Sequence, residues 1–211
     1  GFKAMFVNTT GTNNTSVGNE SLASNISGGS NTALGRSVLN VNTTGQQNTG
    51  AGAFSLDANL EADNNSGFGY ATLSANTSGN ANAAVGRNAL LDNTTGSNNT
   101  ALGTHALQSN TTASNNTAVG FNCLLSNTTG TSNTAVGYTA LDASTEANNN
   151  TAVGHQAASA ITTGGSSVAV GYQALLSATT GTQNVAIGAL TLDATIDGLN
   201  NIAIGYAAVS G

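Results

Sequence analysis

The stretch Asn133-Thr134-Ala135-Val136-Gly137-Tyr138-Thr139-Ala140-Leu141 decides the fold, because versions of it recur along the whole chain. Its glycine returns with a constant 17-residue period, without insertion or deletion, and positions in each repeat are counted from this glycine as position 0. Thirteen glycines keep this register: Gly1, Gly18, Gly35, Gly52, Gly69, Gly86, Gly103, Gly120, Gly137, Gly154, Gly171, Gly188 and Gly205. We therefore expect one continuous repeat array over residues 1–211, as a segment of a longer fibre protein.

Other columns of the repeat are nearly as regular as the glycine. Position −4 is asparagine in almost every repeat, position −2 is small, position −1 is apolar, and position +4 is usually leucine. A 17-residue unit is too short to bury its own apolar side chains, so the units must stack into a solenoid. A solenoid of helix pairs needs ~30 or more residues per repeat, which leaves β-structure.

The sequence thus predicts an all-β fold, a parallel β-solenoid (β-roll) of 17-residue coils. Each unit offers two strand-like pieces, around −3 to −1 and around +3 to +5, separated by Gly and Asn positions that suit turns. Successive coils are expected to pair in register, ~4.8 Å apart, and to bury the side chains at −1 and +4. Stacked asparagines at −4 are expected to bond amide to amide. Structural roles are predicted for Gly120, Gly137, Gly154, Asn116, Asn133 and Asn150.

The small buried area per coil implies a second burial surface. One or two apolar side chains per coil return little against the entropy of ordering a whole repeat unit. The small residues at −2 would let another chain approach closely. We therefore expect a homo-oligomer, most simply a parallel homotrimeric rod.

Composition excludes several classes of function. The net charge is −6, and Lys3, Arg36 and Arg87 are the only Lys and Arg residues, so no basic footprint for nucleic acid exists. The sequence has no run of ~18–20 apolar residues, so it does not predict a membrane-spanning helix. The one cysteine cannot form a disulfide within a chain. Phosphate loops, nucleophile elbows and zinc spacings do not occur in the sequence, so we expect no cofactor, no metal site and no enzyme activity.

Two short motifs carry a resemblance to known families. Asn116-Thr117-Ala118-Val119-Gly120 and Asn184-Val185-Ala186-Ile187-Gly188 resemble the Asn-Ser-Val-Ala-Ile-Gly repeats in the heads of trimeric autotransporter adhesins, which are left-handed parallel β-rolls wound as trimers. The longer form, residues 133–141, also resembles repeats of phage-type tail fibres that end in a self-cleaving chaperone. The adhesin repeat is shorter than the 17-residue repeat found here.

The resemblance implies an extracellular, trimeric attachment rod without catalysis, on a cell surface or in a virion tail fibre. It leaves open whether the parent is an adhesin or a viral fibre. Two other functions remain as alternatives: a self-assembling structural filament or sheath subunit, and an ice-binding β-solenoid.

Aromatic residues recur at position +1, and they are the candidate recognition site. Rings in a row along a rod can stack on sugar faces, which would give a weak multivalent site for a cell-surface glycan. A protein receptor is the other partner considered, and packing at a subunit seam or over the core edge is the structural alternative. The candidate residues are Tyr70, Phe121, Tyr138, Tyr172 and Tyr206.

Carboxylates form three pairs at positions +5 and +9: Asp57 with Glu61, Asp142 with Glu146, and Asp193 with Asp197. Oxygen ligands on a loop can bind Ca²⁺. The pairs are several coils apart, however, and the glycine-aspartate nonapeptide of calcium β-rolls is absent. Solvated loop charges are the favoured interpretation.

Threonine columns raise the ice-binding alternative. Threonine recurs at +8, often beside a second threonine at +9. A flat ice-binding array needs threonines at alternate positions, because alternate residues of a strand share a face and adjacent ones do not.

Cys123 stands at a position otherwise held mainly by small residues, which predicts a packed thiol. His105 and His155 occupy different repeat positions without a ligand-spaced partner.

Overall fold

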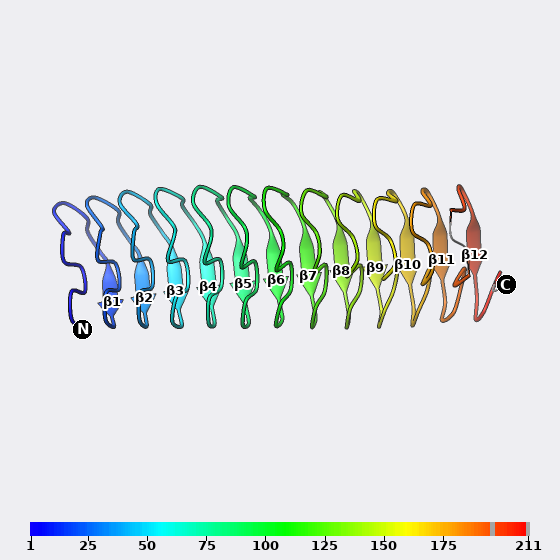
Figure 1. The fold of residues 1–211 in the computed structure, drawn as a ribbon, viewed down its shortest axis with the longest axis horizontal. Coiled ribbons are helices and arrows are strands. Elements are labelled where there is room, and N and C mark those ends of the chain that lie inside the picture. The colour runs from blue at the N-terminus through cyan, green and yellow to red at the C-terminus, as the bar shows by residue number, and fades with distance from the viewer. Residues whose placement is uncertain (195–196, 210–211) are drawn as a thin grey trace.

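The structure is a computed structural model that describes residues 1–194 and 197–209. These residues wind into a row of similar coils that forms a rod, with the two termini at opposite ends (Figure 1). The described residues include no helix and hence none that could cross a membrane. The predicted all-β parallel solenoid with 17-residue coils is confirmed.

Within the described residues, successive coils contribute one short strand each to a single sheet of twelve strands, in chain order. All pairs are parallel and join equivalent positions of successive repeats, as in Thr117↔Thr134 and Val119↔Val136. The predicted register is therefore confirmed. The strands are β1 (Thr15–Val17), β2 (Thr32–Leu34), β3 (Thr49–Ala51), β4 (Ser66–Phe68), β5 (Ala83–Val85), β6 (Thr100–Leu102), β7 (Thr117–Val119), β8 (Thr134–Val136), β9 (Thr151–Val153), β10 (Val168–Val170), β11 (Val185–Ile187) and β12 (Ile202–Ile204).

The strands point their middle residue inward, so the prediction that position −1 is buried is wrong. In β6, Ala101 is buried, whereas Leu102 is 46% exposed. Successive side chains of a strand face opposite sides, so burying −2 forces −3 and −1 outward. The interior between the sheet and the opposite wall accepts Ala, Gly or Ser at −2. The small −2 column therefore fills the core and is not a surface for another chain.

Leucine at +4 supplies most of the buried apolar volume, as predicted. Leu107, Leu124 and Leu141 are fully buried, and a small side chain at +3 such as Ala106 or Cys123 packs beside each leucine. The core thus consists of columns of side chains at −2, +3 and +4, in which each coil contributes one residue to each column.

The second predicted strand, around +3 to +5, does not form in any coil of the described residues, and this expectation is wrong. The segment is a series of turns, because positions +2 and +4 take left-handed backbone conformations, for example Asn122 with φ 51° and Leu124 with φ 50°. A strand cannot hold alternate residues at such angles. The coils still pair here, since Leu124 N–H donates to Ala140 C=O at 3.0 Å.

The glycine at position 0 has a steric cause. Gly120 has φ +139°, and a Cβ on it would lie 2.3 Å from the carbonyl oxygen of Gly137 in the next coil. The strand therefore ends where one backbone passes directly over the next, at a distance that only glycine permits.

Asparagines hold the coils together in two different ways. At −4, Asn133 Oδ1 accepts from the backbone N–H of Asn150 at 3.0 Å, and Asn133 Nδ2 donates to Ala147 C=O at 2.7 Å. The predicted amide-to-amide ladder lies mainly at +7, where Asn93 Nδ2 donates to Asn76 Oδ1 at 2.8 Å. The sequence repeats asparagine at +7 almost as regularly, so that signal was available.

Candidate interaction surfaces of the rod

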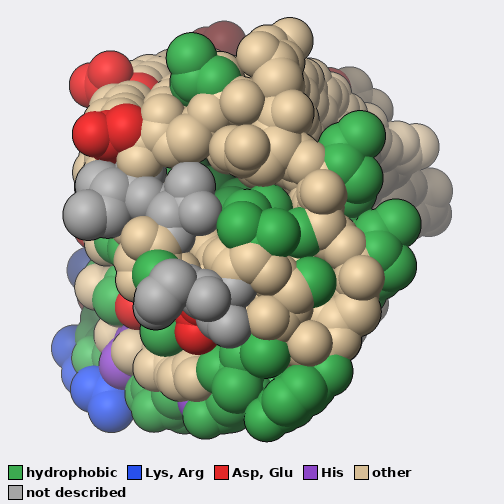
Figure 2. All heavy atoms as spheres, turned by 90° about the vertical axis from the view of Figure 1, so that its right-hand side faces the viewer, with side chains coloured by type: hydrophobic (Ala, Val, Ile, Leu, Met, Phe, Trp, Pro, Cys, Tyr) green, Lys and Arg blue, Asp and Glu red, His purple; other side chains and the backbone are tan. Residues whose placement is uncertain are grey.

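Two surfaces of the rod present apolar groups to solvent. We call the side chains at −3 and −1 of β1–β12 the outer sheet face, and the side chains at +1 the aromatic column. Viewed from the C-terminal end, hydrophobic side chains gather along one side and the bottom of the cross-section, and several carboxylates lie on the opposite side (Figure 2).

The outer sheet face is apolar along its −1 column and free of charge along its whole length. None of its residues is Asp, Glu, Lys or Arg. Its large exposed hydrophobic side chains at −1 are Val17, Leu34, Phe68, Val85, Leu102, Val153, Ile187 and Ile204. A contiguous exposed apolar strip of this kind is a candidate interaction surface.

The outer sheet face changes composition towards its C-terminal end. Most strands up to β9 carry threonine at −3, whereas β10, β11 and β12 carry Val168, Val185 and Ile202 there. Both outward positions of the last three strands are therefore β-branched and apolar.

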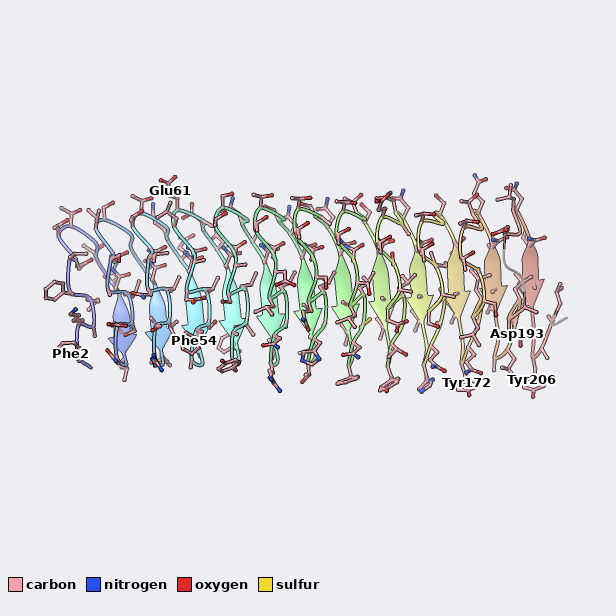
Figure 3. The ribbon with its side chains drawn as sticks, viewed as in Figure 1. Phe2, Phe54, Glu61, Tyr172, Asp193 and Tyr206 are labelled. Carbon is pink, nitrogen blue, oxygen red and sulfur yellow. The ribbon has the colours of Figure 1, made fainter. Side chains whose placement is uncertain are left out.

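The aromatic column contains a continuous stack of four rings. Ring centroids of Phe121 and Tyr138 lie 5.5 Å apart, those of Tyr138 and His155 5.0 Å, and those of His155 and Tyr172 5.4 Å. The first two pairs are within 13° of parallel, and the third is tilted by 31°. Figure 3 shows Tyr172 and Tyr206 along one edge of the rod, opposite Glu61.

The structure brings three of the five candidate residues together. Phe121, Tyr138 and Tyr172 belong to the stack, with His155 as the fourth member. Tyr70 lies outside it and meets Phe54 edge to face at 5.8 Å. Tyr206 is two repeats beyond Tyr172 and is exposed.

Residues at +2 fill gaps in the column, which the sequence analysis missed. Where +1 is Ala53, Phe54 contacts both Arg36, at 5.1 Å, and Tyr70. Where +1 is Thr104, the ring of His105 lies 6.1 Å from that of Phe121. The sequence shows that these two repeats carry their aromatic residue at +2 instead of +1. Its significance is apparent only in the structure, where side chains at both positions lie along the same edge of the rod.

A polar row at +2 accompanies the four-ring stack. Gln173 Nε2 donates to Gln156 Oε1 at 2.8 Å, and His105 Nδ1 lies 3.3 Å from Asn122 Oδ1. Thr139 Oγ1, between them, is buried and has no hydrogen-bond partner. Each coil of the stack thus pairs one ring with one amide or hydroxyl.

Two of the six paired carboxylates have local hydroxyl partners, whereas Asp193 Oδ1 is buried without a hydrogen-bond partner. Asp57 accepts from Ser74 Oγ at 2.6 Å, and Asp197 accepts from Thr180 Oγ1 at 2.6 Å. Burial raises the pKa of Asp142 above its usual value. Among the described residues, no three His, Cys, Asp or Glu side chains lie close enough together to hold a metal ion.

The threonines at +8 bind the next coil. Thr94 Oγ1 donates to Thr111 C=O at 3.0 Å, Thr111 Oγ1 to Thr128 C=O at 3.1 Å, and the pattern repeats along the column. These hydroxyls therefore link successive coils through hydrogen bonds along the loop side of the rod.

Cys123 is fully buried, and burial raises the pKa of its thiol to about 12, so the predicted packed thiol is confirmed.

No family model matches this chain, and no curated protein and no solved structure is significantly similar to it. Any proposal on function therefore rests on the two surfaces and on the resemblance of the repeat motifs.

Proposed function

We propose that the chain is a structural shaft or head segment of an extracellular attachment fibre, assembled as a parallel homotrimer through the outer sheet face. The observation that carries this proposal is the charge-free apolar strip along the rod. Copies of the same 17-residue period can align such strips without mismatch over any length. Parallel alignment keeps each coil beside its equivalent, as a rotation axis along the rod requires.

The size of the strip favours more than one neighbour per chain. Twelve strands ~4.8 Å apart span ~53 Å, and two outward residues per strand give a width of ~10 Å. The resulting ~500 Å² is below the ~800 Å² per partner of a standard stable interface. A three-fold bundle gives each chain two neighbours and brings the flanks of the strip into contact as well.

The extracellular location and the role in attachment follow from the resemblance to adhesin heads and tail fibres. The geometry agrees with a mechanical role, because identical coils produce length and the described residues form no pocket. A self-assembling filament or sheath would use the same face. Discrete rods under the electron microscope support the fibre, and long end-to-end polymers support the filament.

The decisive experiment is native mass spectrometry of the chain, combined with negative-stain imaging. We expect three times the chain mass of 20.6 kDa. Leu102→Lys with Val153→Lys places two charges on the outer sheet face without touching the interior, and should yield folded monomers. Thr95→Lys with Thr112→Lys adds the same charge on exposed loop positions and should leave the trimer intact. A folded monomeric wild type would refute the proposal.

Ice binding is a second candidate, because the outer sheet face also presents threonines in register. Thr117 pairs with Thr134 and Thr134 with Thr151, so their outward side chains repeat at the strand spacing beside the −1 column. This array differs from the +8 threonines, whose hydroxyls bond the backbone. Thermal hysteresis that disappears in Thr117→Lys with Thr134→Lys would favour ice binding. A trimer without hysteresis would exclude it, since one face cannot serve both roles.

A further inference from the structure

We propose that the four-ring stack from Phe121 to Tyr172, together with the polar row at +2, binds a neutral linear polysaccharide laid along the rod. This goes beyond the proposed function, because a fibre can assemble and span a distance without this strip. The strip is defined by Phe121, Tyr138, His155 and Tyr172 at +1 and by Asn122, Thr139, Gln156 and Gln173 at +2.

The rings are available to a ligand. Phe121, Tyr138 and Tyr172 are 43%, 50% and 49% exposed, and His155 is also exposed. Rings that are nearly parallel with centroids 5.0 to 5.5 Å apart are offset from one another, as aromatic pairs prefer. Each ring therefore covers only part of its neighbour, and its outer edge and part of its face remain open to the apolar C–H groups of a sugar.

The polar row supplies the second half of sugar recognition. Pyranose rings carry apolar C–H patches and hydroxyls side by side, so they fit a surface where an aromatic ring adjoins an amide. Gln156 and Gln173 already bond each other, which fixes their amides and leaves their remaining donor and acceptor sites free. Thr139 stands in the same row, but its Oγ1 is buried, so the polar groups that a ligand can meet are the amides of the row.

Charge selects the type of polysaccharide. No Asp, Glu, Lys or Arg stands at +1 or +2 in the repeats from Thr104 to Leu190. The strip has no lysine or arginine to pair with carboxylate or sulfate groups, and the chain as a whole has a net charge of −6. Acidic polysaccharides are therefore disfavoured, and a neutral one is specified.

The period of the strip favours a polymer over a protein partner. One ring and one polar group recur every ~4.8 Å, a spacing comparable with one unit of an extended polysaccharide. A folded protein offers no matching repeat, and the strip lacks the central pocket in which protein hot spots cluster. Successive units of a polymer can each contact a coil, so that weak contacts accumulate.

The test is calorimetric titration of the full chain with cellohexaose, xylohexaose and chitohexaose as neutral probes, and with hexagalacturonate as the acidic one. We expect at least one neutral probe to bind and its disaccharide to bind at least tenfold more weakly. Tyr138→Ala should weaken binding about threefold to tenfold, the effect of one aromatic contact. Tyr138→Phe retains the ring and should bind within about twofold of wild type.

Tyr70→Ala is the matched control, because Tyr70 is 51% exposed at the same repeat position but lies outside the stack. It should leave affinity unchanged. The proposal is overturned if no neutral hexasaccharide binds, if only hexagalacturonate binds, or if Tyr70→Ala and Tyr138→Ala have equal effects. Mass measurement reports assembly separately, so failure of the trimer and failure of this site are distinguishable.

Discussion

The coils before and after Asn127 follow the same path around different interiors. From Asn8 to Asn127 the +7 column is asparagine in every repeat, and each amide bonds the one before it. The next three repeats hold Ser144, Ile161 and Ala178 in the same column, with Ile161 and Ala178 fully buried. The outer sheet face changes in the same direction, since −3 becomes apolar from β10 onward.

The +7 side chain does not set the course of the backbone. The N–H of Asn127 donates to Leu124 C=O at 3.3 Å, that of Ser144 to Leu141 C=O at 3.2 Å, and that of Ile161 to Ala158 C=O at 3.2 Å. The same turn therefore forms around an amide, a hydroxyl or a hydrocarbon. A buried column needs either complete hydrogen bonding or no polar groups, and the chain uses one solution in each region.

The junction between the two regions is imperfect. Asn127 Oδ1 and Ser144 Oγ are both buried and have no hydrogen-bond partner. The Ser144 side chain is too short to reach the amide of Asn127 and continue the ladder. Unpaired buried polar atoms are costly, so this junction is the weakest point of the column.

The largest effect should be equal in both regions, because it depends on the backbone. A Cβ at Gly103 or at Gly154 would lie 2.3 Å from the glycine carbonyl oxygen of the next coil, and both residues have a positive φ, +142° and +145°. Gly103→Ala and Gly154→Ala should each lower the free energy of unfolding by about 3 kcal/mol or more. Chemical denaturation measures the change.

Gly29→Ala is the control for these two variants, because its nearest neighbour would be Thr12 O at 3.3 Å and its φ is not in the left-handed range. It should cost less than about 1 kcal/mol. Tolerance of alanine at only one of the two tested glycines would show that the two regions differ in backbone and not only in side chains.

Deleting one rung should distinguish the two interiors. Asn93→Ala removes the donor to Asn76 Oδ1 and the acceptor of Asn110 Nδ2, at a cost of about 2–4 kcal/mol. Ile161→Ala costs a similar amount through a cavity. A third variant distinguishes the two interiors: Ile161→Asn should destabilise the chain, because Ala178 in the next coil has no donor for the oxygen of the new amide.

Thermal unfolding followed by circular dichroism measures these three variants. Gln108→Ala is the control, because it removes an amide from a half-buried position outside the ladder. An Ile161→Asn chain as stable as wild type would mean that the +7 column accepts amides regardless of their neighbours. The distinction between the two interiors would then be lost.

Extending the ladder by one rung should stabilise the junction. Ser144→Asn places an amide where its Nδ2 can donate to Asn127 Oδ1, as in the preceding rungs, and should raise the free energy of unfolding by about 1 kcal/mol. Ser159→Asn, at a half-buried loop position, should have no effect. Equal effects from the two substitutions would remove the explanation by ladder extension.

The smallest effect is a pH dependence from two carboxyls, one in each region. Burial raises the pKa of Asp142 and of Asp92 from 3.8, so the folded chain keeps a proton that the unfolded chain has lost. Stability therefore falls as pH rises from about 3.8 through the raised pKa. Asp142→Asn should be more stable than wild type at pH 7 and no more stable at pH 3.

Asp92→Asn should show the same trend more weakly, because Asp92 is the more exposed of the two. Melting temperatures over the pH range from 3 to 8 provide the comparison. A stability advantage of Asp142→Asn that persists unchanged at pH 3 would assign the effect to packing and not to ionisation.

The candidate surfaces were only partly predictable. The rings at +1 were evident in the sequence, but which of them touch was not, because Phe54 and His105 reach the same edge from +2. The −1 column was recognised as apolar and placed inside. Alternation within a strand permits either face to be buried, and only the width available in the coil selects one.

The 17-residue coil, the parallel register and the need for glycine at position 0 were all predictable from the sequence, because a strict period admits one repeated geometry. Three features became apparent only in the folded coils: −2 faces inward and −1 outward, the +4 leucine has a left-handed backbone conformation, and the amide ladder runs at +7. Those choices depend on how one coil lies against the next. The spacing of residue types along the chain does not specify how closely one coil packs against the next.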